Sequence, residues 1–128
     1  MKALKFYFEN TKGTGVLATA DADGKVDAAI YARPHILEDG TAAFIMNDRL
    51  THENLRSNPH AAYLFIEQGE GYKGKRLFLT QVREEQDSEL LYTLKRRTYS
   101  PHAAVQKGPK FLVIFKIDKE LPLVGAGD

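Results

Sequence analysis

Two Asp-Gly pairs, Asp23-Gly24 and Asp39-Gly40, constrain the fold of this chain more than any other feature of its sequence. Asp-Gly favours the two-residue turn of a β-hairpin, because its backbone tolerates the positive φ angles of such turns. The first pair lies between an apolar run, residues 15–20, and an alternating stretch, residues 26–33. The second leads into another apolar run, residues 41–46. Two strand–turn–strand units so close together predict an antiparallel meander.

The alternating stretch has two faces and a definite end. Pro34 ends its ladder, because proline has no N–H to donate. Side chains two residues apart share one face of a strand. One face therefore carries Val26, Ala28, Ile30 and Ala32, and the other carries Asp27, Ala29, Tyr31 and Arg33.

Three further strands are expected at residues 61–66, 75–84 and 111–117, which are apolar or alternate in character. A glycine-rich loop, residues 68–74, separates the first two. With the three strands around the Asp-Gly turns, the total is six. Six strands interrupted by short helices predict a mainly β fold, a six-stranded antiparallel barrel that closes to avoid exposed edges. Two or three short helices cannot cover both faces of a parallel sheet, which argues against a doubly wound fold.

Short helices are expected between these strands. Thr51 is a good N-cap for one helix, which Asn58-Pro59 ends. Asp87 can cap a second helix, from residue 88 to about residue 98, whose leucines form one apolar stripe. The residues before Gly13 have the apolar spacing of a short leading helix.

Composition limits the class of protein. The 128 residues predict one domain over residues 1–128, with a loosely held tail at about 119–128. The absence of cysteine excludes disulfides, thiolate metal sites and thiol nucleophiles. A net charge of +1 gives no strong field toward nucleic acid or an anionic membrane. No apolar run approaches the ~20 residues of a membrane span, and the N-terminus lacks a signal-peptide pattern, so we expect a cytoplasmic protein.

Common catalytic motifs are absent, including the nucleophile elbow, the zinc-protease helix and the glycine-rich phosphate loops. The four histidines are scattered, and none pairs with another at a spacing of four residues. Surface or hydrogen-bonded histidines are therefore favoured over metal ligands, and we expect no metal site. His52-Glu53 looks like half of a zinc-protease motif, but without a second histidine an exposed helical pair is the favoured interpretation.

The informative segment is Ile45 to Pro59, where a strand meets a helix through a polar turn that carries Arg49 and Thr51. The free N–H groups of a first helical turn, together with the helix dipole, favour an anion such as phosphate. A guanidinium beside them adds charge-assisted hydrogen bonds. The alternative is that Thr51 only caps the helix and that Arg49 only faces solvent.

This segment, in its position after the Asp-Gly hairpin, resembles the flavin-binding turn of the pyridoxamine 5′-phosphate oxidase-like split barrels. That family shows a strand, a turn with Ser or Thr and Arg or Lys, and a helix that ends in Asn-Pro or Asp-Pro. The resemblance also includes residues 15–19 and 74–79 and extends over about residues 10–118, and in length the chain is similar to small FMN-binding proteins of this group. It implies a six-stranded split β-barrel and a homodimer that holds FMN at the subunit interface.

The resemblance also implies the residues that contact the flavin. True oxidases carry an Arg-Lys pair in the turn, where this chain has Leu50-Thr51, so Arg49 is expected to supply the charge. A flavin outside the barrel needs a covering surface, and Tyr31, Phe65 and Tyr72 are candidates to line the seam between two chains. The implied contacts are Ala29, Ile30, Tyr31 and Arg33 before Pro34, Ile45 and Met46 through backbone groups at the next strand's end, Arg49, Leu50 and Thr51 at the phosphate, and Lys75 and Arg76 after the glycine-rich loop.

The activity that the resemblance implies is that of a small FMN-dependent oxidoreductase or electron-transfer protein, with a small-molecule or protein redox partner. No catalytic side chain is needed, because reduced FMN itself delivers hydride or electrons. The end of the chain lacks the basic segment with which authentic oxidases bind the vitamin phosphate, so that substrate is not expected. Two alternatives stay open: a non-catalytic flavin- or haem-binding module, and an F420-dependent reductase. Tyr31 either stacks on the flavin or is an ordinary barrel or interface aromatic.

Overall fold

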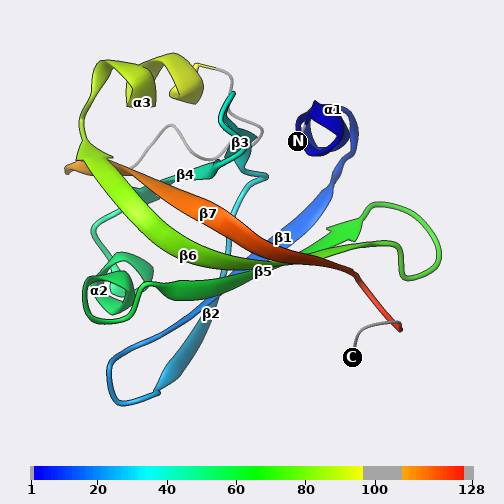
Figure 1. Cartoon of the computed structure of the whole chain (residues 1–128), viewed down its shortest axis with the longest axis horizontal. Coiled ribbons are helices and arrows are strands. Elements are labelled where there is room, and N and C mark those ends of the chain that lie inside the picture. The colour runs from blue at the N-terminus through cyan, green and yellow to red at the C-terminus, as the bar shows by residue number, and fades with distance from the viewer. Residues whose placement is uncertain (1, 97–107, 126–128) are drawn as a thin grey trace.

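The computed structural model describes residues 2–96 and 108–125, which contain three helices and seven strands (Figure 1). The chain begins with a helix and alternates short helices with strands. In chain order the elements are α1 (Lys2–Asn10), β1 (Gly13–Ala20), β2 (Val26–Ile30), β3 (His35–Ile36), β4 (Ala42–Asn47), α2 (Leu50–Ser57), β5 (His60–Glu67), β6 (Gly74–Gln86), α3 (Glu89–Lys95) and β7 (Lys110–Pro122).

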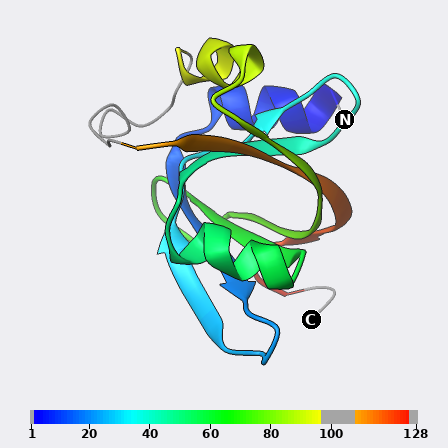
Figure 2. The same cartoon turned by 90° about the vertical axis from the view of Figure 1, so that its left-hand side faces the viewer.

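The strands form one antiparallel sheet in the order β2-β1-β5-β6-β7-β4-β3. Both Asp-Gly pairs lie where the sequence predicts them, between β1 and β2 and between β3 and β4, and Gly24 and Gly40 have φ angles of 84° and 87°. Figure 2 shows the sheet curling round its interior, with α2 on one side and α1 and α3 on the opposite side. The expected mainly β, antiparallel architecture is therefore confirmed.

The sheet contains a strand that the sequence analysis did not predict. The β1–β2 ladder ends at Ile30, before Pro34, as expected. The chain then pairs again, because His35 and Ile36 form β3 against Ala43 and Ala42 of β4. The expected six strands are thus one too few for the described residues, since a two-residue edge strand shows no alternation that could reveal it.

The expectation of a loose tail from residue 119 was wrong for residues 119–122. These residues belong to β7, which pairs with β6 as far as Lys75 opposite Pro122. An ion pair of 2.6 Å between Lys75 Nζ and Glu120 Oε2 connects the two strands near this end. Two of these four residues are charged and one is proline, so the segment resembles a tail, but the long β6 supplies the backbone partners that hold it.

The start of α2 also differs from the prediction. The helix begins at Leu50, and its N-cap is Arg49, whose side chain makes no capping hydrogen bond. Thr51, the predicted cap, instead lies inside the first turn and is only 4% exposed. Its hydroxyl is therefore directed to tertiary contacts rather than to the helix end.

Helices α1 and α3 form where the sequence predicts them, but the N-cap of α3 is a different residue. Ser88 Oγ accepts a hydrogen bond of 3.1 Å from the backbone N–H of Leu91 and so caps α3. Asp87, the predicted cap, has a φ of 47°, so the chain turns at this residue. Leu91 and Leu94 are buried, as the predicted stripe requires, and residue 98, the expected helix end, lies outside the described residues.

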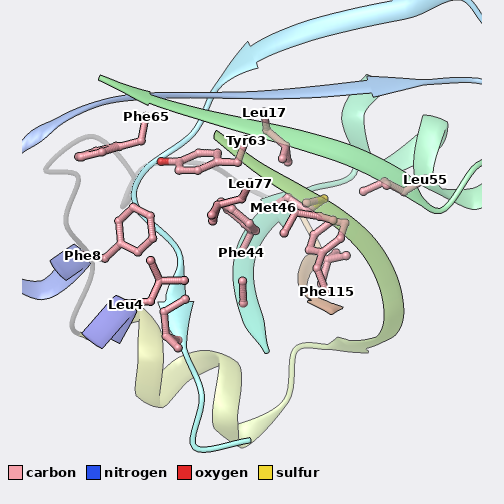
Figure 3. Packing of buried hydrophobic residues seen from close by; sticks show 14 of the residues in the cluster. Leu4, Phe8, Leu17, Phe44, Met46, Leu55, Tyr63, Phe65, Leu77 and Phe115 are labelled. Carbon is pink, nitrogen blue, oxygen red and sulfur yellow. The ribbon is translucent and has the colours of Figure 1, made fainter. Parts of the chain in front are cut away.

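Two hydrophobic clusters lie on opposite faces of β4 and β7. The larger fills the interior of the curled sheet, where Phe44 contacts Tyr63 and Phe115 with ring centroids 5.0 and 5.7 Å apart (Figure 3). Each large side chain buried there contributes roughly 1.5–3 kcal/mol. The smaller cluster joins β4 and β7 to α3 and comprises Ala43, Leu91, Leu94, Leu112 and Ile114.

Tyr63 supplies a polar contact inside this apolar interior. The residue is fully buried, and its hydroxyl donates a hydrogen bond of 3.1 Å to the carbonyl of Tyr31. Gly15 makes room for this contact, because a Cβ at Gly15 would clash with the Tyr63 hydroxyl. Burial raises the pKa of Tyr63 well above its ordinary value. The tyrosine therefore stays neutral and acts as a donor.

We expect Tyr63→Phe to lower the free energy of unfolding by about 1–3 kcal/mol, because a buried carbonyl loses its donor. Tyr72→Phe is the matched control, since Tyr72 is 83% exposed and its change should stay within about 0.5 kcal/mol. Urea denaturation of the three proteins measures both effects. Equal stability of Tyr63→Phe and the wild type would contradict the role assigned to this hydrogen bond.

Candidate functional site

The turn between β4 and α2 places a cation at the start of a helix. Arg49 has an extended φ of −131°, and its backbone N–H donates to the carbonyl of Asn47 at 3.0 Å. The first helical hydrogen bond runs from Glu53 to the carbonyl of Arg49 at 2.9 Å. The amides between these two residues precede the helical ladder, so the helix itself offers them no carbonyl. Arg49 is exposed beside them, and this combination favours an anion.

Tyr31 connects this turn to the end of the β1–β2 hairpin. Its ring lies edge-on against Phe44, with centroids 6.2 Å apart, and its hydroxyl forms a side-chain hydrogen bond with Thr51. Burial raises the pKa of Tyr31, while the hydrogen bond with Thr51 and the positive charge of Arg49 act in the opposite direction. Three predicted site residues from two distant segments, Tyr31, Arg49 and Thr51, are thus brought together.

An open groove of about 680 Å³ lies beside Tyr31. Three segments line it: residues 12–15 at the start of β1, residues 30–33 after β2, and residues 66–68 at the end of β5. The backbone N–H of Gln68 donates to the carbonyl of Lys12 at 2.9 Å and joins two of these segments. The groove therefore contains three of the predicted flavin contacts, Ile30, Tyr31 and Arg33.

Arg33 has a structural partner in addition to its place in the groove. Its Nη1 donates to the carbonyls of Phe8 and Thr11 at 3.0 and 2.5 Å. These carbonyls lie at the C-terminal end of α1, where a cation is favourable. Arg33 thus fastens α1 to the segment after β2, and its contact with a flavin stays a prediction.

The side chains of the predicted contacts Ala29, Ile45 and Met46 are buried or half-buried. Met46 is 2% exposed in the main core, and Ile45 packs against the smaller cluster. Ala29 pairs with the buried Leu17. Ile45 and Met46 could therefore offer backbone groups, as the resemblance implies. β3 pairs only with Ala42 and Ala43, the first two residues of β4. Among the described residues, the rest of β4 therefore has no strand partner on this side.

Lys75 and Arg76 are not brought to Tyr31 and Arg49 within one chain. Lys75 Nζ lies 4.7 Å from the ring centroid of Tyr7 and pairs with Glu120, and Arg76 Nε donates to the carbonyl of Pro122 at 2.9 Å. Arg76 occupies the same cross-strand row as Ile30, three strands away. At about 4.8 Å per strand this separation is roughly 14 Å.

The outer face of the sheet over β2, β1, β5 and β6 is largely apolar, and the charged Arg76 lies on it at the β6 end of the Ile30 row. Residues directly opposite each other on antiparallel strands point to the same side. Val26 and Ile30 are 83% and 72% exposed, so the alternating strand presents its apolar face outward. We call this surface the outer apolar face. It comprises Val16, Ala18, Val26, Ala28, Ile30, Ala62, Leu64 and Phe78.

One predicted seam residue is in the wrong place for that role. Phe65 is fully buried, and its ring packs edge-on against that of Phe8 with centroids 5.4 Å apart, so it belongs to the core. In a strand that is apolar throughout, the sequence does not show which face of the sheet a residue lies on, and Phe65 lies on the inner face. Tyr72 is 83% exposed, and its place in a seam stays a prediction.

The sequence analysis missed several residues around the site. His52 was expected on an exposed surface but is 1% exposed. Of the groove residues Lys12, Glu67 and Gln68, only Gln68 had been assigned from the sequence, to the glycine-rich loop. Gly15, two residues after Gly13, was the available signal, because a glycine inside an apolar strand often marks a close approach of another group.

Solved structures share this fold. An FMN-binding protein from Syntrophomonas wolfei subsp. wolfei matches with a TM-score of 0.77 and 19% identity, over 96% of this chain and 85% of that chain. The haem storage protein HutZ from Vibrio cholerae matches with a TM-score of 0.68 and 18% identity, over 94% and 92% of the two chains. An F420 reductase matches with a TM-score of 0.64 and 18% identity, over 89% and 93%.

No protein-family model and no curated protein matches the sequence. Among the described residues, no helix is long and apolar enough to cross a membrane. The similarity to these proteins thus lies in the three-dimensional fold. It extends over nearly the whole chain, although the sequence identity is low. This chain has the antiparallel split β-barrel fold that the resemblance implied and that these proteins share.

Proposed function

We propose that this chain is an FMN-binding flavoprotein that acts as a homodimer. The phosphate would lie at the first turn of α2, and the rest of the flavin along Tyr31 and the groove. The observation that carries this proposal is the position of Tyr31, whose hydroxyl meets Thr51 beside Arg49 while the residue also lines the groove. The fold shared with an FMN-binding protein supports it.

The start of α2 fits a phosphate group. Backbone N–H groups and the Arg49 guanidinium are the donors that a phosphate requires. Arg49 makes no capping hydrogen bond that would occupy the helix start. Leu50 is 57% exposed, so the turn is open to solvent and to a ligand.

The groove fits the rest of a flavin in size and character. Sites for molecules of this size usually measure about 300–1,000 Å³ and combine apolar walls with a few polar groups. Here Ile30, Tyr31 and Ile66 supply apolar surface, and Lys12 and Gln68 supply polar groups. An open groove on one chain leaves one side of a flat ring in water, and a second surface is needed to cover it.

The outer apolar face supplies a reason for a second copy of the chain. Contiguous exposed apolar surface on a small protein usually marks an interaction site. Ile30 belongs both to this face and to the groove. Two-fold pairing through the face would place a second chain at the groove edge and create two equivalent sites.

FMN supplies redox chemistry when bound, and the chain supplies binding, orientation and shielding. We therefore propose a small oxidoreductase or an electron-transfer protein, whose redox partner is a small molecule or another protein. Arg49 and the α2 amides would hold the phosphate, and the groove residues would orient the ring. Neither role requires a side chain that gives or takes a proton.

The absorption spectrum of the freshly purified protein, with extraction and mass analysis of its cofactor, tests this proposal. We expect flavin bands and one FMN per chain. A Soret band would establish the alternative of haem binding, and a deazaflavin spectrum would establish the F420 alternative. Either result, or the failure of apoprotein to take up added FMN, would contradict the proposed function.

Arg49→Ala tests the phosphate site. We expect FMN binding to weaken by one to two decades in Kd, which is about 1.4 kcal/mol per decade, because the guanidinium would meet the phosphate of the flavin and not its ring. Riboflavin binding should hardly change. Arg83→Ala is the control, since Arg83 is exposed and pairs only loosely with Glu85, at 3.7 Å. Fluorescence titration of the wild type and the two variants with both flavins measures all six constants, and equal losses for both flavins in Arg49→Ala would show that Arg49 does not meet the phosphate.

Ala28→Asp tests the dimer. Ala28 lies near the middle of the outer apolar face, opposite Ala18, so a carboxylate there would be buried unpaired between two chains. We expect a monomer at micromolar concentration by light scattering, with FMN lost at the same time. Val82→Asp is the control, because Val82 is 52% exposed and lies outside this face. A wild-type monomer that carries one FMN would overturn the proposed assembly.

A further inference from the structure

His52 forms a buried polar contact that the proposed function does not use. The residue is 1% exposed, and its ring stacks on Phe111 with centroids 3.9 Å apart and an interplanar angle of 21°. Its Nδ1 lies 2.8 Å from Asp48 Oδ1, and its Nε2 lies 3.0 Å from Glu84 Oε1. Both ring nitrogens of one buried histidine therefore face carboxylate oxygens.

This geometry determines which hydrogens the ring needs. An ionised carboxylate only accepts hydrogen bonds, so each nitrogen must carry a hydrogen for both contacts to be hydrogen bonds. A neutral imidazole would leave one lone pair against a carboxylate. The hydrogen bond with His52 holds the pKa of Asp48 below its usual range, and the positive charge of Arg56 adds to this effect. Asp48 is therefore an ionised acceptor at neutral pH.

The other elements packed around His52 add few charges. Arg56 Nη2 lies 3.6 Å from Asp48 Oδ1, on the same helix as His52. On β6, Gln81 Nε2 lies 3.4 Å from Glu84 Oε1. Phe111 of β7 covers the ring face without a charge. The two carboxylates are thus the groups that face the ring nitrogens directly.

The contact joins two parts of the fold at the proposed phosphate site. Asp48 immediately precedes Arg49. Glu84 lies on β6 and is 32 residues from His52 in the sequence. Through His52, the turn before α2 is fastened to the sheet. A change at His52 would therefore move the backbone that presents Arg49 and the first amides of α2.

We propose that His52 is a positioning residue for the phosphate site, which donates hydrogen bonds from both ring nitrogens and so fastens the Asp48–Arg49 turn to β6. The ligand in this inference rests on the proposed function. The donation of hydrogen bonds from both ring nitrogens does not rest on the proposed function, because it concerns contacts within this chain alone.

A His52 ring without its second hydrogen would lose one of the two hydrogen bonds, because an ionised carboxylate cannot donate in its place. The turn would then loosen, and the part of the affinity that depends on the phosphate would fall. Glu84→Gln removes this dependence on the second hydrogen, since an amide can either accept from Nε2 or donate to it. This variant keeps the size of the side chain at a position that is 36% exposed.

The first measurement uses the protein without FMN. The ¹⁵N shifts of the His52 imidazole at about pH 6 report which nitrogens carry hydrogen. We expect hydrogens on both nitrogens in the wild type. A single unprotonated nitrogen at that pH overturns the double donation, including the case in which Glu84 carries the hydrogen instead.

The second measurement is the ratio of the Kd values for riboflavin and FMN in the wild type, His52→Gln, Glu84→Gln and His60→Gln. We expect the preference for FMN in Glu84→Gln and His60→Gln to stay within about twofold of the wild type, because an amide at residue 84 can still accept from Nε2. His60 is an exposed histidine that contacts Thr80 and serves as the matched control.

His52→Gln completes the test, and we expect it to weaken FMN about tenfold and riboflavin less than twofold. Equal losses of both flavins in His52→Gln overturn the positioning role. Wild-type protein that binds neither flavin overturns the proposed function and the positioning role together. The ¹⁵N result then still decides whether His52 donates from both nitrogens.

Discussion

The hydrogen bond from the Tyr63 hydroxyl to the carbonyl of Tyr31 is the contact on which both the core and the candidate site depend. The β1–β2 ladder ends at Ile30, and Pro34 prevents it from resuming at once. Between these points two bonds hold the backbone of Tyr31: this one, and the bond from the Tyr31 N–H to the carbonyl of Gly15 at 3.0 Å. They fix the backbone of Tyr31 at the mouth of the barrel, so its ring can reach the start of α2.

Short sequence patterns predict most of the fold and the centre of the candidate site. Both Asp-Gly turns, the apolar strands and the strand–turn–helix around Arg49 are encoded within a few residues of one another, so the sequence alone predicts them. Tyr31 was a candidate because the resemblance places flavin contacts on the strand before Pro34. Its meeting with Thr51 joins segments 20 residues apart, and only the resemblance to a known family suggested that they share one site.

The features that the sequence did not reveal depend on partners far along the chain. His52 looks like an exposed helical residue until Glu84, 32 residues later, is placed against it. Residues 119–122 look like a tail until β6 pairs with them. The alternation in β2 was predicted correctly, yet alternation does not tell which face lies inside, and here the apolar face points outward. Burial of one face is a property of the whole sheet and not of the strand.

Ile30 shows why the proposed dimer and the proposed cofactor site would not be independent. The residue is 72% exposed, belongs to the outer apolar face and also lines the groove. A ligand in the groove would therefore rest against a side chain that a second copy of the chain also covers. Ligand binding and pairing would then each strengthen the other by the same free energy, because such coupling is reciprocal. The barrel interior is already filled by aromatic and aliphatic side chains, so a cofactor would have to lie outside it, where the proposed pairing of two chains would cover it.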